Sequence, residues 1–262
     1  MRTLLTICGL SLLACWPFPG DAQEESLVLY FSFDKEVVDE IKDLSAHQND
    51  GKISGNPKWD KGRIGRAIEF DGSDDQVVVP TSESLDIKSA ITMMAWVKPS
   101  KNLLEDWRTI IGKSPTNVLG QATFAYDLRT DKSGTYRFSL NMGGWQKVVG
   151  PNAEIGKWTH VANTYNGKTM VLYLNGDSVG DIAAKGKINV IPDPVGIGNV
   201  VDAGGAGKNE YWAGLLDEVK IWNRALSLKE VKEQMDFTQQ DILAVHPKNK
   251  LTTIWGQLKQ KK

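Results

Sequence analysis

The chain has 262 residues, and its 31 lysines and arginines against 32 aspartates and glutamates give a formal net charge of −1 at pH 7. This balance argues against nucleic acid as a partner, because binding to phosphates needs a clustered excess of basic residues. Hydrophobic residues make up 41% of the chain, enough for a large core, and the two cysteines and three histidines exclude most zinc and thiol chemistry.

The first 22 residues have the organisation of a secretory signal peptide. Arg2 supplies a positive start, and residues 3–14 form an apolar segment that is too short to span a bilayer. Gly20 and Ala22 are small residues at the −3 and −1 positions of a cleavage site. We therefore expect a secreted or cell-surface protein with no membrane span.

Both cysteines lie inside this leader. Cleavage after Ala22 removes Cys8 and Cys15, so the mature chain is predicted to contain no disulfide. An alternative is that Leu12 to Cys15 is a bacterial lipobox, in which Cys15 carries a lipid and anchors the protein.

From residue 27 onward, short segments with a period of two predict β-strands. The predicted strands are Leu27–Phe33, Gln76–Val79, Ile91–Lys98, Arg108–Gly112, Phe124–Arg129, Tyr136–Asn141, Trp158–Tyr165, Met170–Leu174, Ile197–Gly198 and Gly214–Trp222. Two Asn-Gly pairs, at 166–167 and 175–176, predict tight hairpins in which both central residues have positive φ.

The pattern becomes helical after Trp222. Ser227 and Glu230 fit a capping box, and Leu228, Val231 and Met235 follow at helical spacing, which predicts one helix over residues 227–236. We predict an all-β domain over residues 27–236, a two-sheet antiparallel jelly-roll sandwich with one short C-terminal helix, followed by a polar tail over 237–262.

Eight stretches, in this order along the chain, resemble the laminin G-like, concanavalin A-like jelly-roll domains of bacterial exported proteins. They are Tyr30–Asp34, Asp43–Ser45, Asn49–Gly51, Ala67–Gly72, Ile91–Pro99, Trp158–Ala162, Tyr173–Gly176 and Leu216–Ser227. The resemblance covers about residues 27–236 and implies the fold, but this fold carries sugar binding, adhesion, structural metal sites and glycosidase activity.

Oxygen-bearing side chains in these stretches suggest a calcium site. Asp34 follows the first strand, Asn49 lies in a turn and Asp217 lies on the last strand, and the first and last strands of a jelly roll can be neighbours. The resemblance implies one structural calcium held by these residues. The alternative is that Asp34 and Asp43 only cap turns. The acidic segment Asp71–Asp75 is predicted to be a solvated turn because it lacks the EF-hand pattern.

The sequence predicts no catalytic residues. It contains no Glu-x-Asp-x-x-Glu run of the kind that concanavalin A-like glycosidases often carry. Asp217 and Glu218 are adjacent on a predicted strand, so regular alternation places them on opposite faces. His160 lies in an alternating strand and is predicted to be a satisfied sheet residue.

Aromatic residues beside polar groups are the remaining candidates for a site. Trp107 and Trp145, with the amide of Asn141, are predicted to bind a ligand from loops, because sugars stack on aromatic faces. Trp212, beside Gly214, is a further loop-placed aromatic, whereas Trp96, Trp158 and Trp222 are predicted to be core residues, and the glycine-rich segment 202–207 a flexible loop.

The sequence therefore predicts a non-catalytic extracellular recognition module for glycan or protein. The alternatives are a divergent glycosidase and a purely structural adhesion domain with no small ligand.

Overall fold

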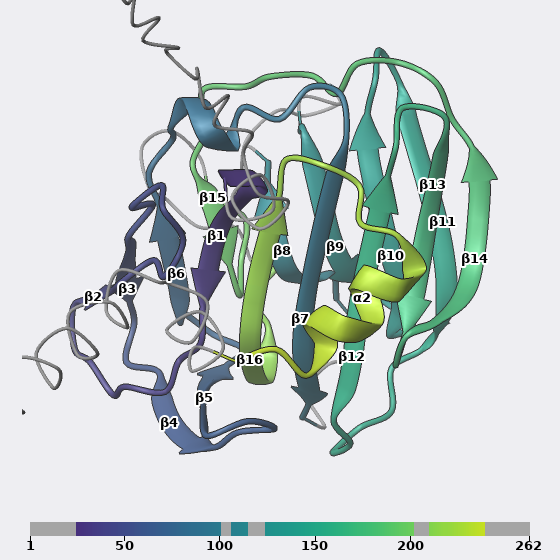
Figure 1. Cartoon of the computed structure of the whole chain (residues 1–262). Coiled ribbons are helices and arrows are strands. Elements are labelled where there is room, and N and C mark those ends of the chain that lie inside the picture. Colours follow the sequence, from purple (N-terminus) through teal and green to yellow (C-terminus); the bar gives the residue numbers. More distant parts are fainter. Residues whose placement is uncertain (1–24, 101–105, 115–123, 202–209, 239–262) are drawn as a thin grey trace, which may run out of the picture.

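The computed structural model describes residues 25–100, 106–114, 124–201 and 210–238. The predicted leader with Cys15, the segment 202–207 and nearly all of the predicted tail lie outside these residues. In the described part, two antiparallel eight-stranded sheets face each other, as Figure 1 shows, and the predicted fold class is confirmed.

The first sheet contains the strands nearest to the two ends of the described chain. Its order is β14 (Asp177–Ala183), β13 (Thr169–Leu174), β12 (Thr159–Tyr165), β7 (Ile91–Pro99), β16 (Ala213–Trp222), β5 (Arg66–Asp71) and β4 (Lys58–Lys61), and β1 (Leu27–Phe31) also pairs with β16. The predicted proximity of the first and last strands is thus present, since Tyr30 lies opposite Lys220.

The second sheet is formed by the remaining eight strands. Its order is β11 (Trp145–Asn152), β10 (Thr135–Asn141), β9 (Tyr126–Thr130), β8 (Arg108–Lys113), β15 (Val195–Ile197), β6 (Gln76–Val79), β3 (Gly51–Ser54) and β2 (Glu40–Ile41). The short helix η1 (Glu83–Leu85) connects β6 to β7 across the sandwich.

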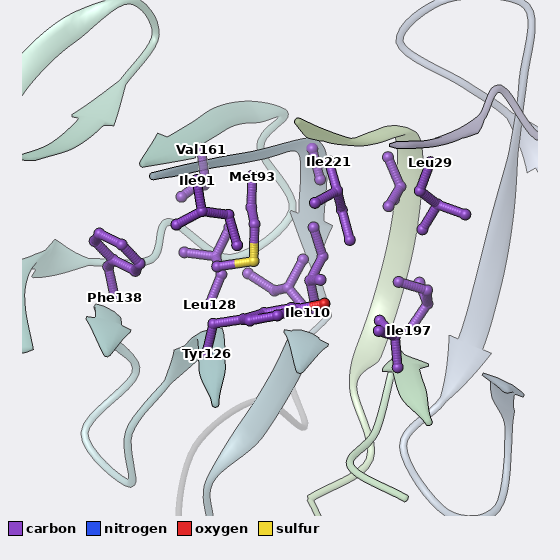
Figure 2. Packing of buried hydrophobic residues seen from close by; sticks show 14 of the residues in the cluster. Leu29, Ile91, Met93, Ile110, Tyr126, Leu128, Phe138, Val161, Ile197 and Ile221 are labelled. Atoms are coloured by element: carbon purple, nitrogen blue, oxygen red, sulfur yellow. The ribbon is translucent and has the colours of Figure 1, made fainter. Parts of the chain in front are cut away.

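One apolar core fills the space between the sheets. Because side chains alternate along a strand, each sheet gives every second residue to this core. Figure 2 shows Ile91, Met93 and Val161 of the first sheet approaching Tyr126 and Leu128 of the second, and all five are buried.

The helix α2 (Leu228–Met235) covers the outer face of the first sheet, across β7 and β12 (Figure 1). The predicted capping box is confirmed, since the Ser227 hydroxyl accepts from the Glu230 N–H while the Glu230 carboxylate accepts from the Ser227 N–H. Val231 joins a second, smaller apolar cluster with Met94 and Trp222. None of the helices in the described part of the chain has the length and apolar character to cross a membrane.

The two predicted Asn-Gly hairpins have different geometries. Asn175 and Gly176 both have positive φ, 51° and 81°, as the two-residue turn requires. At the other turn only Gly167 has positive φ, which corrects the prediction. Three residues separate β12 from β13 there, and the Asn166 side chain accepts from the N–H groups of Lys168 and Thr169.

Candidate functional site

The outer face of β8, β9, β10 and β11 carries a group of charged and aromatic residues that we name the Arg129 cluster. Along β9, Tyr126 and Leu128 point into the core, so Asp127 and Arg129 point outward. Arg137 of β10 lies directly opposite Arg129 in the antiparallel register and shares its face. The Arg129 cluster consists of Trp107, Phe124, Asp127, Arg129, Asp131, Arg137, Trp145, Lys147 and Glu210.

Arg129 joins two carboxylates from different parts of the chain. Its NH2 group lies 3.0 Å from Asp127 Oδ2, and its NH1 group donates to Glu210 Oε2 at 3.1 Å. Glu210 Oε2 also accepts from the Thr109 hydroxyl at 3.2 Å. Burial raises the pKa of Asp127 to about 6, although the positive charge of Arg129 acts in the opposite direction.

Two tryptophans lie beside this guanidinium. The Arg129 Cζ atom is 4.7 Å from the ring centroid of Trp107 and 5.7 Å from that of Trp145, and the Arg137 Cζ atom is 5.3 Å from Trp107. Trp145 also contacts Phe124, with ring centroids 4.2 Å apart. Trp107 is half-buried, whereas Trp145 is 50% exposed, so Trp145 offers the larger free aromatic surface.

The structure places the predicted residues Trp107 and Trp145 beside one guanidinium and puts Asn141 directly opposite Trp145 in the register of β10 and β11. Asn141 is buried, and its Oδ1 accepts from the Gly144 N–H at 3.1 Å, within the turn that leads to Trp145. Trp145 is the first residue of β11 and not a loop residue, which corrects its predicted setting. Trp212, the third loop candidate, is fully buried in the core.

Sequence reasoning missed the charged members of this cluster. The signal was present in Tyr126 to Thr130, where charged and apolar residues alternate along a strand whose five residues are all buried. Glu210 gave no such signal, because it is far from Arg129 in the sequence. The N–H of Thr109 donates to the backbone carbonyl of Glu210, and this bond holds the Glu210 side chain beside Arg129.

The predicted calcium ligands Asp34 and Asp217 both contact the turn between β4 and β5. Asp34 Oδ1 accepts from the Arg66 N–H at 3.2 Å, and Asp217 Oδ2 accepts from the Ile64 N–H at 2.9 Å. Gly65 lies between these donors with φ of 53°, and a Cβ atom there would lie 1.9 Å from Asp34 Oδ1. The turn therefore needs glycine at this position.

Asp217 keeps one oxygen that suits a cation. The residue is fully buried, its Oδ1 has no hydrogen-bond partner among the described residues, and burial raises its pKa to about 8. The charges of Glu218 and Asp34 act in the same direction on this pKa, and the N–H groups that donate to Asp217 and Asp34, those of Ile64 and Arg66, are two residues apart in one turn. An orphaned buried oxygen beside a second carboxylate fits the chemistry of a calcium site.

Asn49 makes other contacts. Its Nδ2 donates to Val28 O at 2.7 Å and to Ser84 Oγ at 2.9 Å, and its Oδ1 accepts from the Ser82 hydroxyl at 2.7 Å. These bonds join β1 to η1 and account for the burial of the side chain. A calcium ligand at Asn49 stays a prediction without geometric support.

Asp217 and Glu218 do not obey the predicted alternation. The register of β16 against β7 shifts between Asp217 and Lys220, and Glu218 has φ of 52°. This bulge places one extra residue on β16, so Leu216 and Val219 both reach the core. Asp217 and Glu218 therefore both lie on the outer side, where burial raises the pKa of Tyr30 and the charges of Glu218 and Asp217 raise it further.

Beneath α2, this bulge supports a buried polar network. The Tyr30 hydroxyl donates to Glu218 Oε2 at 2.7 Å, and Lys220 Nζ lies 2.8 Å from the same oxygen. Lys220 also donates to Phe237 O at 2.6 Å. His160 is buried 5.3 Å from the Trp96 ring, and its Nδ1 has no hydrogen-bond partner among the described residues, so it is less satisfied than predicted.

The acidic turn of residues 71–75 and a small cavity beside Asp34 are weaker candidates for a binding site. Carboxylate oxygens of Asp71, Asp74 and Asp75 lie within 4.8 Å of one another, but Asp75 is buried and accepts from the backbone of Asn56 and Asp71, so this turn is less solvated than predicted. A cavity of about 110 Å³ beside Asp34 is smaller than the several hundred Å³ typical of ligand pockets.

The chain is similar in sequence to two distant relatives among known proteins. Pappalysin-1 of Homo sapiens is 26% identical over 185 residues, which are 65% of this chain and 11% of pappalysin-1. The Mus musculus protein is 26% identical over 184 residues, with the same coverage. The chain thus spans about a tenth of the length of these curated relatives.

Solved structures share the fold at identities of 20% or less. The binding domain of Paraclostridial Mosquitocidal Protein 1 has a TM-score of 0.61 at 18% identity, covering 80% of this chain and 52% of that one. The binding domain of botulinum neurotoxin DC in complex with SialylT has a TM-score of 0.61 at 18% identity, with coverage of 80% and 50%. Domain 4 of AbnA, a GH43 extracellular arabinanase from Geobacillus stearothermophilus, in complex with arabinotriose, has a TM-score of 0.59 at 20% identity, with coverage of 80% and 98%.

The sequence also matches a protein-family model. The laminin G model described as "Concanavalin A-like lectin/glucanases superfamily" matches residues 71–232, which include every member of the Arg129 cluster as well as Asp217. Since this match spans more than half of the sequence, the chain belongs to the concanavalin A-like lectin/glucanase superfamily.

Proposed function

We propose that this domain is a non-catalytic glycan-recognition module that acts outside the cell and binds its ligand at the Arg129 cluster. The observation that carries the proposal is the half-exposed Trp145 ring, held in place by Phe124 and Arg129. A fixed, accessible aromatic face beside charged hydrogen-bonding groups is the usual platform for a sugar ring. The solved complex of the arabinanase domain with arabinotriose, on the same fold, supports this choice of ligand.

The arrangement of the carboxylates favours binding over hydrolysis. A glycosidase needs two carboxylates that flank the scissile bond across an open space. In the Arg129 cluster, the space between Asp127 and Glu210 is occupied by the guanidinium that contacts both. We therefore propose that the domain binds glycans without cleaving them, and incubation with oligosaccharides followed by product analysis checks this.

We also propose that Asp34 and Asp217 hold a structural calcium ion. The orphaned Oδ1 of Asp217 and the nearby Asp34 carboxylate support this site. When bound, the ion offsets the repulsion between the buried carboxylates and ties β1 and β16 to the turn before β5.

The test of the glycan proposal is substitution of the exposed ring. Trp145→Ala is expected to weaken glycan binding about tenfold, equivalent to about 1.4 kcal/mol, because the stacking surface is lost. Trp145→Tyr should retain most of the affinity. A glycan array identifies the ligand, and calorimetry measures the change.

Ile155→Ala is the matched control, since Ile155 is 42% exposed in the connection between β11 and β12. Unchanged thermal unfolding shows that each variant is folded. An array without binding to any glycan contradicts the proposal and leaves protein adhesion as the remaining function.

A further inference from the structure

The charges of the Arg129 cluster cancel. Arg137 lies directly opposite Arg129, an arrangement that is repulsive in an antiparallel sheet unless carboxylates compensate. The described residues of this face supply three basic and three acidic side chains: Arg129, Arg137 and Lys147 against Asp127, Asp131 and Glu210. Among the described residues these charges sum to zero: Arg129 and Arg137 form ion pairs with the three acids, and Lys147 is exposed outside these pairs.

Arg129 has little capacity left for an acidic ligand. Its NH1 and NH2 groups face Glu210 and Asp127, and Trp107 lies against the plane of its guanidinium. Only 7% of Arg129 is exposed, and Asp127 is almost fully buried. To bind Arg129, a carboxylate or sulfate on the ligand would have to displace one of these acids, which would leave a buried charge without its partner.

Arg137 is occupied in the same way. Its Nε donates to Asp131 Oδ2 at 2.7 Å, and its NH2 group lies 2.5 Å from the same oxygen. The other oxygen, Asp131 Oδ1, accepts from the N–H groups of Ser133 and Thr135, which fixes the carboxylate in its turn. The pair is therefore rigid, and its charge is satisfied within the protein.

Glu210 is the acid of this cluster that retains an acceptor for a hydroxyl group. Both contacts of the Glu210 carboxylate use Oε2, so Oε1 can accept from a sugar hydroxyl. An uncharged ligand can use this oxygen and the Trp145 ring without breaking an ion pair.

We propose that the Arg129 cluster selects uncharged glycans and discriminates against the same glycans carrying carboxylate or sulfate groups. This inference rests on the proposed glycan binding at Trp145. It adds the chemical class of the ligand, which follows from the paired charges and not from the aromatic ring.

The experiment compares matched glycans on one array. Each neutral oligosaccharide is printed beside its sialylated and sulfated forms, and the affinities of responding pairs are measured by calorimetry. We expect the neutral member to bind at least tenfold more tightly, with an affinity that is nearly the same in about 50 mM and 500 mM NaCl. Equal or tighter binding of the acidic member overturns the charge inference but leaves glycan binding in place, whereas an array without any binding overturns the proposed function itself.

The substitution Asp131→Asn removes the negative charge beside Arg137 while the side chain keeps its size. The amide oxygen can keep the bonds from Ser133 and Thr135, so the turn should persist while Arg137 loses its anionic partner. We expect the preference for neutral glycans to fall several-fold and binding of the acidic forms to become salt-dependent. An unchanged ratio in a folded variant contradicts the role of charge compensation, and thermal unfolding reports the folding.

Discussion

Glu218, with φ of 52°, is the residue at which β16 departs from a regular strand. Regular alternation places Asp217 and Glu218 on opposite faces, but the bulge at Glu218 puts both on the outer side of the first sheet. The spacing of the core residues was the available cue, since Leu216 and Val219 are three apart whereas Val219 and Ile221 are two apart. A bulge depends on the pairing with neighbouring strands, so the sequence of β16 alone does not determine it.

His160 is expected to make stability depend on pH. Burial, together with the charge of Lys220, lowers the pKa of this imidazole to about 3, against 6.5 in the unfolded chain. Its contribution is complete above pH 6.5 and is lost as the pH falls from 6.5 towards 3, with a slope that approaches about 1.4 kcal/mol per pH unit. His160→Phe, which keeps a ring beside Trp96, should remove this slope.

The measurement is the free energy of unfolding in urea at several pH values between 4.5 and 7.5. Burial raises the pKa of Asp127 and Asp217, and both act in the opposite direction in either protein. The difference between wild type and variant therefore isolates His160. A difference that does not change with pH would show that the imidazole is not held neutral in the fold.

At the scale of the element, the helix and the strongly alternating strands were predictable, and the edges of the sheets were not. The capping box of α2 and the positive φ of Asn175 and Gly176 follow from local chemistry. The strands that were missed are β2, β3, β4, β5 and β11, and β14 was predicted only as the second arm of the hairpin at 175–176, without bounds. Strands β14 and β11 form sheet edges and expose most residues, so burial imposes no clear alternation on them.

The same reasoning applies to the candidate site. Trp107 and Trp145 were predictable as polar-flanked aromatics, but their common neighbour Arg129 belongs to a strand whose pairing with β8 and β10 sets the geometry. Glu210 reaches the site from a distant part of the sequence. Long-range pairing of this kind leaves no local pattern.

Loss of the helix cap should have a moderate cost. Ser227→Ala is expected to lower the free energy of unfolding by about 1 kcal/mol, because the N–H of Glu230 loses its acceptor at the start of α2. Ser227→Asp is the control, since aspartate caps equally well. Urea unfolding at 25 °C measures both variants, and an equal loss in both would show that the hydroxyl acts through another contact.

At the scale of the molecule, the described part of the chain is held by the apolar core between the two sheets, and residues 25–262 contain no cysteine that could add a disulfide. A bound ion adds stability by mass action, about 2.7 kcal/mol at a hundredfold excess over its dissociation constant. For a domain of this size, we therefore expect calcium to raise the melting temperature by about 5–10 °C and EDTA to reverse the rise.

Two variants locate the ion. Asp217→Asn should abolish the response to calcium, whereas Asp71→Asn should retain it if Asp34 and Asp217 form the site. The opposite result would place the ion at the acidic turn of residues 71–75. A melting temperature that is indifferent to calcium and to EDTA would end the calcium proposal.

The position of β16 has a consequence for the order of assembly. This strand, near the C-terminal end of the described chain, lies between β7 and β5 and is also the partner of β1, the first strand. During synthesis, β1 ends at Phe31 and β5 at Asp71, and both must wait until the chain has grown to Ala213 before their shared neighbour arrives. The first sheet can close only at the end, so its early strands spend that interval with open edges, the period in which an unfinished chain is most exposed to aggregation.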